Sequence, residues 1–411
     1  MINRIAPGEQ RTILLLAIAA FASAASLRVC DPLLPALAQA FDTSTGSAAA
    51  TITAFALAYG VLQLVYGGLG DRYGKFRVIA WATLACAIGS IGAALAPSLA
   101  WLVFFRVISG ATAAGIIPLS MAWIGDTVPY ETRQATLARL ISGVILGMIG
   151  GAVLGGVFVD LVGWRWLFVV LAVVYVAVGS LLYSAVRRCD EARLRAGTAA
   201  SRPSLRFVAQ MRAVLRVRWA RVVIGAAMVE GLLIFGALSF VPAFLHERFN
   251  VPLSAAGAIL GTYGVGGLVY TAAAKRLVTR LGEVRLAAAG GLVMSVAFLL
   301  LLAAPAWPWT VPACFLVGAG FYLLHGTLQT HATQMVPHAR GTAVSLFAGA
   351  LFVGQSIGVT AGAWILDYAG IGWLLGIASI GLALVGLGFA LLLKRRLPPP
   401  IAGNQCACTD S

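Results

Sequence analysis

The stretch Gly67-Gly68-Leu69-Gly70-Asp71-Arg72-Tyr73-Gly74-Lys75-Phe76-Arg77 separates two apolar runs, residues 48–67 and 78–96. Each run has the ~20 residues that a helix needs to cross a bilayer. We therefore expect a short loop between two membrane-spanning helices, with glycines that permit a sharp reversal. Its basic residues favour the cytoplasmic side of the membrane. A basic loop does not require the fixed glycines and the acid between them, so these residues carry further information.

The loop resembles the cytoplasmic loop signature of the major facilitator superfamily, which reads G-x-L-x-D-R-x-G-R/K. The matching residues are Gly68, Leu69, Asp71, Arg72, Gly74 and Lys75. We expect Asp71 where the third helix begins, because a carboxylate there can accept hydrogen bonds from free N–H groups. The resemblance extends over residues ~12–393. It implies a twelve-helix transporter most similar to the drug and small-metabolite efflux branch.

Composition independently indicates a polytopic membrane protein. Of the 411 residues, 60% are hydrophobic and only 10% are charged, whereas soluble domains carry about 25% charge. The net charge of +15 would suggest nucleic-acid binding in a soluble protein. Six scattered cysteines do not indicate a disulfide framework.

Apolar runs predict an all-α protein with twelve membrane-spanning helices. In the first half these spans are 12–31, 48–67, 78–96, 101–124, 137–159 and 166–186. In the second half they are 222–245, 252–273, 286–305, 310–330, 342–366 and 372–393. Ten arginines interrupt the pattern between the halves. We predict a first six-helix half over residues 1–186 and a second over residues 222–393. A cytoplasmic linker, residues 187–221, joins them, and a cytoplasmic tail, residues 394–411, follows.

The distribution of basic residues predicts the orientation in the membrane. With both termini in the cytoplasm, 25 of the 29 Lys and Arg residues fall on the cytoplasmic side. This asymmetry follows the positive-inside rule, so it explains the net charge without nucleic acid. We expect a monomer in a bacterial-type inner membrane, with lipid, protons and a small-molecule substrate as its partners.

An internal repeat supports two related halves. At an offset of 207 the recurring pairs are Arg133/Arg340, Gly147/Gly354, Gly151/Gly358, Gly155/Gly362, Asp160/Asp367, Gly163/Gly370 and Trp166/Trp373. At an offset of 208 they are Arg72/Arg280, Gly74/Gly282 and Arg77/Arg285. Repeated halves are typical of transporters whose substrate site lies between the halves, near the middle of the membrane.

Ionisable residues inside the predicted spans are candidates for function, because inserting one costs ~2.5–3.5 kcal/mol. Arg28 and Asp31 share one helix face near the outer end of the first span. They could form a local ion pair, or they could contact substrate at the outward mouth. Arg106, followed four residues later by Gly110, matches a fourth-helix signature that the resemblance links to proton transfer. Snorkelling of Arg106 to the outer interface is the alternative.

Glu230 lies in the middle of the seventh span. A carboxyl group in an apolar site can bind and release a proton near neutral pH, which proton-coupled transport requires. The alternative is a protonated side chain that only forms a hydrogen bond between helices. We predict that Glu230, Arg106 and Asp31 couple transport to protons, with the proton gradient as energy source and no cofactor.

Polar residues on the tenth helix predict a substrate cavity. Tyr322, His325 and Gln329 share one helix face, and His can titrate near neutral pH, although a buried structural His is the alternative. The other predicted cavity residues are Arg28, Gln63, Tyr59, Tyr263 and Gln355.

Two further groups follow from the resemblance. Asp126 and Arg133 are expected to join the Gly68–Lys75 loop as a cytoplasmic latch that distinguishes two conformations. On the fifth helix the run resembles the antiporter signature G-x-x-x-G-P-x-x-G-G, with Ala152 in the proline position. Its glycines are Gly147, Gly151, Gly155 and Gly156. Small residues at this spacing also permit close helix packing without any other role.

The sequence thus predicts proton-coupled efflux of a small organic compound by alternating access. A proton-coupled importer on the same fold is the first alternative. A soft-metal transporter would use His331, Met335, Cys406 and Cys408, although we predict no metal site. A membrane scaffold or sensor is the third alternative, with the Arg-rich linker as its partner surface. The sequence lacks a Gly-Lys-Ser/Thr phosphate-binding loop, so we expect neither ATP-driven transport nor an enzyme. The predicted cavity limits the substrate only to a small anionic or amphipathic molecule.

Overall fold

The computed structural model describes residues 7–196 and 207–396, and no strand occurs among them. The helices of the first half are α1 (Pro7–Arg28), α2 (Leu34–Ala40), α3 (Thr45–Ala48), α4 (Ala50–Tyr73), α5 (Lys75–Ala94), α6 (Leu99–Ala113), α7 (Ile116–Thr127), α8 (Tyr130–Leu161) and α9 (Trp164–Ala196). Those that follow are α10 (Phe207–Arg216), α11 (Arg218–Leu238), α12 (Val241–Phe249), α13 (Leu253–Ala303), α14 (Thr310–Gln334), α15 (Arg340–Ala369) and α16 (Ile371–Arg396). Short 3₁₀ turns precede α14 and α15, at Trp307–Trp309 and Pro337–Ala339.

The twelve predicted spans are present. Eleven helical segments of the described chain are long and apolar enough to cross a membrane. One of them, α13, contains two spans, because Gly282 interrupts it with a non-helical backbone at φ +70°. This left-handed φ favours glycine, and the interruption falls between the predicted spans 252–273 and 286–305.

The first and seventh spans are interrupted at corresponding depths. The first span breaks between α1 and α2, at residues 29–33, where Pro32 removes a backbone donor. The seventh breaks at Ser239–Phe240, between α11 and α12. The first segment long and apolar enough to cross a membrane ends at Arg28, close to the predicted end at residue 31, and the separate short helix α2 follows the break. Arg28 and Asp31 therefore lie at the end of α1 and in the break that follows it.

Two rows of glycines bring neighbouring helices into backbone contact. A Cβ atom added to Gly147 or Gly151 would lie 2.3 or 2.4 Å from a carbonyl oxygen of α1, and one added to Gly155 would lie 2.6 Å from the carbonyl oxygen of Val29, just after α1. The repeat partners Gly354, Gly358 and Gly362 would meet carbonyl oxygens of α11 in the same way. The close-packing interpretation of the fifth-helix glycines is therefore supported by the geometry, and it applies equally to the eleventh span.

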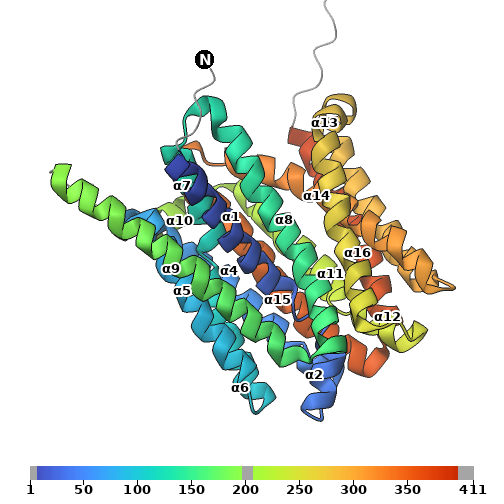
Figure 1. The fold of residues 1–411 in the computed structure, drawn as a ribbon. Helices are drawn as coiled ribbons and strands as arrows, with labels where there is room; N and C mark the ends of the chain where they lie inside the picture. Colours follow the sequence, from blue (N-terminus) through green and yellow to red (C-terminus); the bar gives the residue numbers. More distant parts are fainter. Residues whose placement is uncertain (1–6, 197–206, 397–411) are drawn as a thin grey trace, which may run out of the picture.

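The two halves touch at one end of the molecule, here called the closed end. There Gly156 approaches the backbone of Leu253 and Gly257 approaches Ala152, while Gly60 approaches Gly349 farther along α4 and α15. Toward the other end the halves diverge (Figure 1). That end carries the α4–α5 turn and the α13 interruption, and we call it the Arg-rich end. The start of α1 and the end of α16 also lie there (Figure 1).

Helical structure extends into the predicted linker. α9 continues to Ala196, and α10 occupies Phe207–Arg216. The Thr342 hydroxyl of α15 donates a 2.8 Å hydrogen bond to Gln210 on α10, so this helix packs on the second half. Cys406 and Cys408 lie outside the described residues.

We expect Gly151→Ala to destabilise the protein by about 1–3 kcal/mol, because the added methyl group must displace α1. The measurement is the thermal unfolding midpoint of the purified protein in detergent. Gly388→Ala is the matched control, because a Cβ there has open space within 4 Å. An unchanged midpoint for Gly151→Ala would contradict the proposed backbone contact.

Candidate functional site

Glu230 on α11 and His325 on α14 form a buried pair. His325 Nδ1 lies 2.8 Å from Glu230 Oε2. Glu230 is fully buried, while the His325 side chain is 14% exposed. A hydrogen bond of this length requires at least one proton on the pair, and the second carboxylate oxygen, Oε1, has no recorded partner. The pair can therefore hold one proton or two. It also forms the hydrogen bond between helices, here α11 and α14, that was the alternative role for Glu230.

Aromatic rings surround the imidazole of this pair. Phe321 stacks on His325 with ring centroids 4.7 Å apart, and the Phe347 ring lies 5.1 Å away. Such rings exclude water from one side of the pair and lower the local dielectric, which strengthens electrostatic interactions. Two residues predicted separately from the sequence thus form a single unit.

Arg28 and Asp31 form the local ion pair, with Nη1 and Oδ2 2.9 Å apart. Arg28 also reaches the second half, because its guanidinium lies 4.5 Å from the Phe235 ring and 5.6 Å from the Tyr263 ring. Both partners are buried. The ion pair and the contact across the halves therefore coexist in one arrangement.

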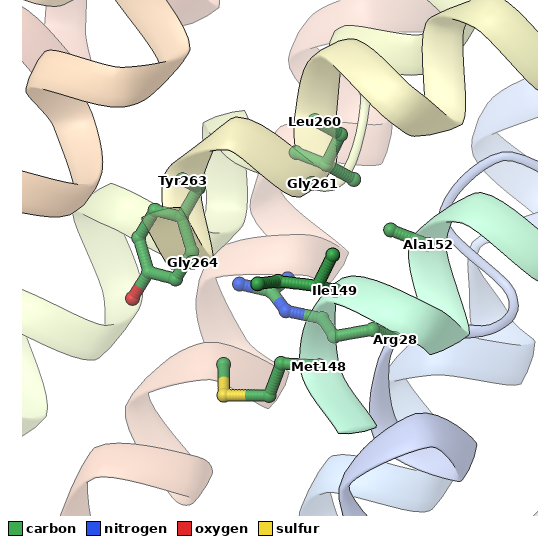
Figure 2. Close-up of a pocket in the computed structure, with 8 residues that line it drawn as sticks. All are labelled: Arg28, Met148, Ile149, Ala152, Leu260, Gly261, Tyr263 and Gly264. Atoms are coloured by element: carbon green, nitrogen blue, oxygen red, sulfur yellow. The ribbon is translucent and has the colours of Figure 1, made fainter. Parts of the chain in front are cut away.

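A small pocket lies at this contact, between α1, α8 and α13, with a cavity volume of about 10 Å³. Arg28 extends from α1 toward Tyr263 on α13 (Figure 2). The remaining walls are apolar or glycine, contributed by Met148, Ile149, Ala152, Leu260, Gly261 and Gly264. Arg28 and Tyr263 therefore supply the polar side chains of an otherwise apolar pocket.

Arg106 is buried in the first half and does not snorkel to the interface. It donates hydrogen bonds to the carbonyl oxygens of Ser26 at 2.9 Å and Thr51 at 3.2 Å, and it lies over Phe55. Ser26 is in the last turn of α1, where carbonyl groups lack partners within the helix and carry partial negative charge. The break after α1 thus supplies an acceptor for Arg106, and this explains why the guanidinium remains inside.

The other predicted cavity residues are only partly brought together. Tyr322 lies beside Tyr263, with ring centroids 6.4 Å apart. Tyr59 packs against Phe352 of the second half. Gln63 and Gln355 are buried and have side-chain atoms without recorded partners. Gln329 is exposed and lies one turn beyond His325 toward the Arg-rich end.

The signature loop differs from its predicted geometry in one respect. Asp71 is exposed in the last turn of α4, not at the start of the third helix. The reason is that α4 continues to Tyr73, and Gly74, at φ +91°, makes the reversal. Lys75 pairs with Asp126 on α7, within the first half. Arg133 instead donates to the carbonyl of Val128, so the latch role is still a prediction.

The second half has a counterpart of the Lys75–Asp126 pair with acid and base exchanged. Glu283 corresponds to Lys75 at the repeat offset of 208. Its carboxylate lies 3.1 Å from His331 Nε2. His331, considered above as a soft-metal ligand, is thus engaged by a carboxylate. Among the residues that the structure describes, no cluster of three or more His, Cys, Asp or Glu side chains has the geometry of a metal site.

Two acids at the closed end, for which the sequence predicted no role, join the halves. The Ser44 hydroxyl donates to Asp367 Oδ2 at 2.7 Å. The backbone N–H of Ser254, at the start of α13, donates to Asp160 Oδ2 at 2.8 Å. Asp160 and Asp367 are repeat partners, and this recurrence in the sequence is the signal that could have identified them as functional residues. A carboxylate at a helix N-terminus is stabilising, so these bonds hold the closed end together.

A family model described as Major Facilitator Superfamily matches residues 16–355. The chain belongs to the major facilitator superfamily. It is 26% identical over 384 residues to the uncharacterized MFS-type transporter YwfA of Bacillus subtilis, covering 92% of this chain and 90% of that protein. It is 32% identical over 173 residues to the multidrug export protein EmrB of Escherichia coli K12, covering 42% of this chain and 34% of that protein.

Solved structures confirm the superfamily fold. A D-xylose-proton symporter aligns with a TM-score of 0.72 at 16% identity, covering 95% of this chain and 98% of that one. A bacterial homologue of the human lysosomal transporter Spinster, in an inward-facing and unoccupied conformation, aligns with a TM-score of 0.67 at 18% identity, covering 95% and 96%. The protein is therefore an integral membrane transporter and not an enzyme.

We expect the double substitution Asp160→Ala and Asp367→Ala to loosen the closed end. Losing two carboxylates at helix N-termini removes about 1 kcal/mol of stabilisation from the conformer in which this end is closed. This corresponds to about a fivefold change in its population relative to the conformer in which this end is open. The measurement is the distance between spin labels at the exposed positions Leu161 and Tyr368, in a background without native cysteines. Glu247→Gln, an exposed acid on α12, is the control. An unchanged distance distribution in the double variant would contradict the role of these acids.

Proposed function

We propose that this transporter exports a small organic compound in exchange for protons, by alternating access. The observation that carries the proposal is the buried Glu230–His325 pair, at 2.8 Å. The partial similarity to multidrug export proteins supports export. The bias of basic residues toward the Arg-rich end supports placing that end in the cytoplasm, so the halves diverge toward the cytoplasm in this conformation.

The pair provides a proton site whose occupancy can depend on conformation. Glu230 is fully buried and His325 retains partial exposure, so a proton can reach the imidazole first and then be shared with the carboxylate. When the closed end opens, the same pair would become accessible from the outside. A group that faces each side in turn can carry a proton down its gradient.

Exchange requires that proton and substrate disfavour each other at the site. Thermodynamic linkage makes this effect reciprocal: if the substrate lowers the affinity for the proton, the proton lowers the affinity for the substrate by the same factor. The unpartnered Oε1 of Glu230 supports this requirement, because a substrate group that binds it competes with protonation. An importer would need the opposite sign, with substrate and proton strengthening each other.

The direct test is proton movement in proteoliposomes during a screen of amphiphiles and metabolites. We expect a substrate-triggered pH change in the wild type that falls to background in Glu230→Gln, because the amide cannot carry the proton. Glu131→Gln, an exposed acid at the start of α8, is the matched control and should retain the signal.

Four results would contradict parts of this proposal. Equal signals from wild type and Glu230→Gln would move the proton site to Asp31 or His325. Proton entry that accompanies substrate entry would identify an importer. Silence from every compound in both proteins would favour a scaffold or sensor, and a signal from a soft metal ion alone would favour metal transport.

A further inference from the structure

We propose that the substrate is amphoteric, with an oxyanion group that binds Arg28 and Tyr263 and a cationic or donor group that binds Glu230. This inference rests on the proposed exchange with protons. It concerns three polar atoms that are buried at the contact between the halves and have no recorded partner. They are Arg28 Nη2, the Tyr263 hydroxyl and Glu230 Oε1.

The oxyanion end follows from the pocket between α1, α8 and α13. Asp31 occupies only Nη1 of Arg28, so Nη2 is free to donate. The Tyr263 ring lies 5.6 Å from the guanidinium carbon, and its hydroxyl can donate as well. A buried donor without a partner costs about 1–3 kcal/mol. Two such donors in one apolar pocket match the two oxygens of a carboxylate or a similar group.

The cationic end follows from the proton pair. The Phe321 ring lies 5.8 Å from the Tyr263 ring and stacks on His325 at 4.7 Å, so Tyr263 and the proton pair adjoin the same aromatic ring. His325 engages only Oε2 of Glu230, so Oε1 is an acceptor without a donor. An ammonium group or another donor at Oε1 would stabilise the ionised carboxylate and so oppose its protonation.

Singly charged molecules fit this arrangement less well. A simple anion would satisfy Arg28 but would attract a proton to the neighbouring pair, the opposite of what exchange requires. A simple cation would compete with the proton but would lie near the Arg28 guanidinium. The rings of Phe235, Tyr263, Phe321 and Tyr322 adjoin one another, so an aromatic body would pack well between the two polar ends.

The test uses two matched sets of probes and isothermal titration calorimetry on the purified full-length protein. One set is 4-(aminomethyl)benzoate, 4-methylbenzoate and 4-methylbenzylamine. The other is L-phenylalanine, 3-phenylpropionate and phenethylamine, whose charged groups lie closer together. Titrations in buffers of different ionisation enthalpy report protons released on binding.

We expect one zwitterion to bind about tenfold or more tightly than both of its singly charged relatives, the size of one charge-assisted hydrogen bond. Its binding should release protons. In Arg28→Gln, the zwitterion should bind no more tightly than the amine. In Glu230→Gln, it should bind no more tightly than the carboxylate, and its binding should release no protons. Tyr263→Phe should weaken the zwitterion about threefold to tenfold.

Arg165→Gln is the matched control for loss of an arginine, because Arg165 donates to the carbonyl of Ala96 away from the pocket. If a site variant does not fold, the affinities of the zwitterions and their singly charged relatives for the wild type still test the inference. Equal or tighter binding of a singly charged relative would overturn the inference, as would no binding of any probe. Proton movement driven by another compound in the screen would then leave the proposed export intact. Zwitterion binding without proton movement would instead refute the exchange.

Discussion

Charged side chains inside a membrane-spanning bundle must be paired or hydrogen-bonded, and this constraint accounts for the arrangement at the contact between the halves. Arg106 donates to backbone carbonyls, one of them in the last turn of α1. Arg28 pairs with Asp31 and lies over rings of the other half. Glu230 is held by His325. Because Arg28 reaches across the halves, moving the halves changes its environment, and this couples charge to conformation.

Pseudo-symmetry explains how the same physical devices occur twice. Glycine rows on α8 and α15 allow backbone contact with α1 and α11 respectively. The first and seventh spans break at corresponding positions, and acids at the ends of α8 and α15 bind helix starts in the opposite half. The halves differ where coupling is proposed: the Glu230–His325 pair belongs to the second half alone, and Arg28 to the first. This asymmetry places the proposed proton site in one half and the arginine that reaches across the contact in the other.

The sequence predicted the fold well because hydropathy, charge bias and small-residue spacing are local signals. It singled out Glu230 and His325 but not their contact, because packing of α11 against α14 joins residues that are 95 positions apart. The position of Asp71 was wrong because the left-handed backbone of Gly74, and not the acid, sets where α4 ends. The short helix α2 was not predicted, because Pro32 ended the predicted first span. Asp160 and Asp367 could have been found from their recurrence in the repeat.

Infrared difference spectroscopy of the purified protein across a pH titration tests the central claim most directly, because it detects protonation of a buried carboxyl group without any substrate. We expect a carboxylic-acid C=O band that appears as the pH falls, is absent in Glu230→Gln and persists in Asp31→Asn. A band that is unchanged in Glu230→Gln would show that Glu230 does not bind the proton. A band lost only in Asp31→Asn would assign the proton to the Arg28–Asp31 pair and contradict the account.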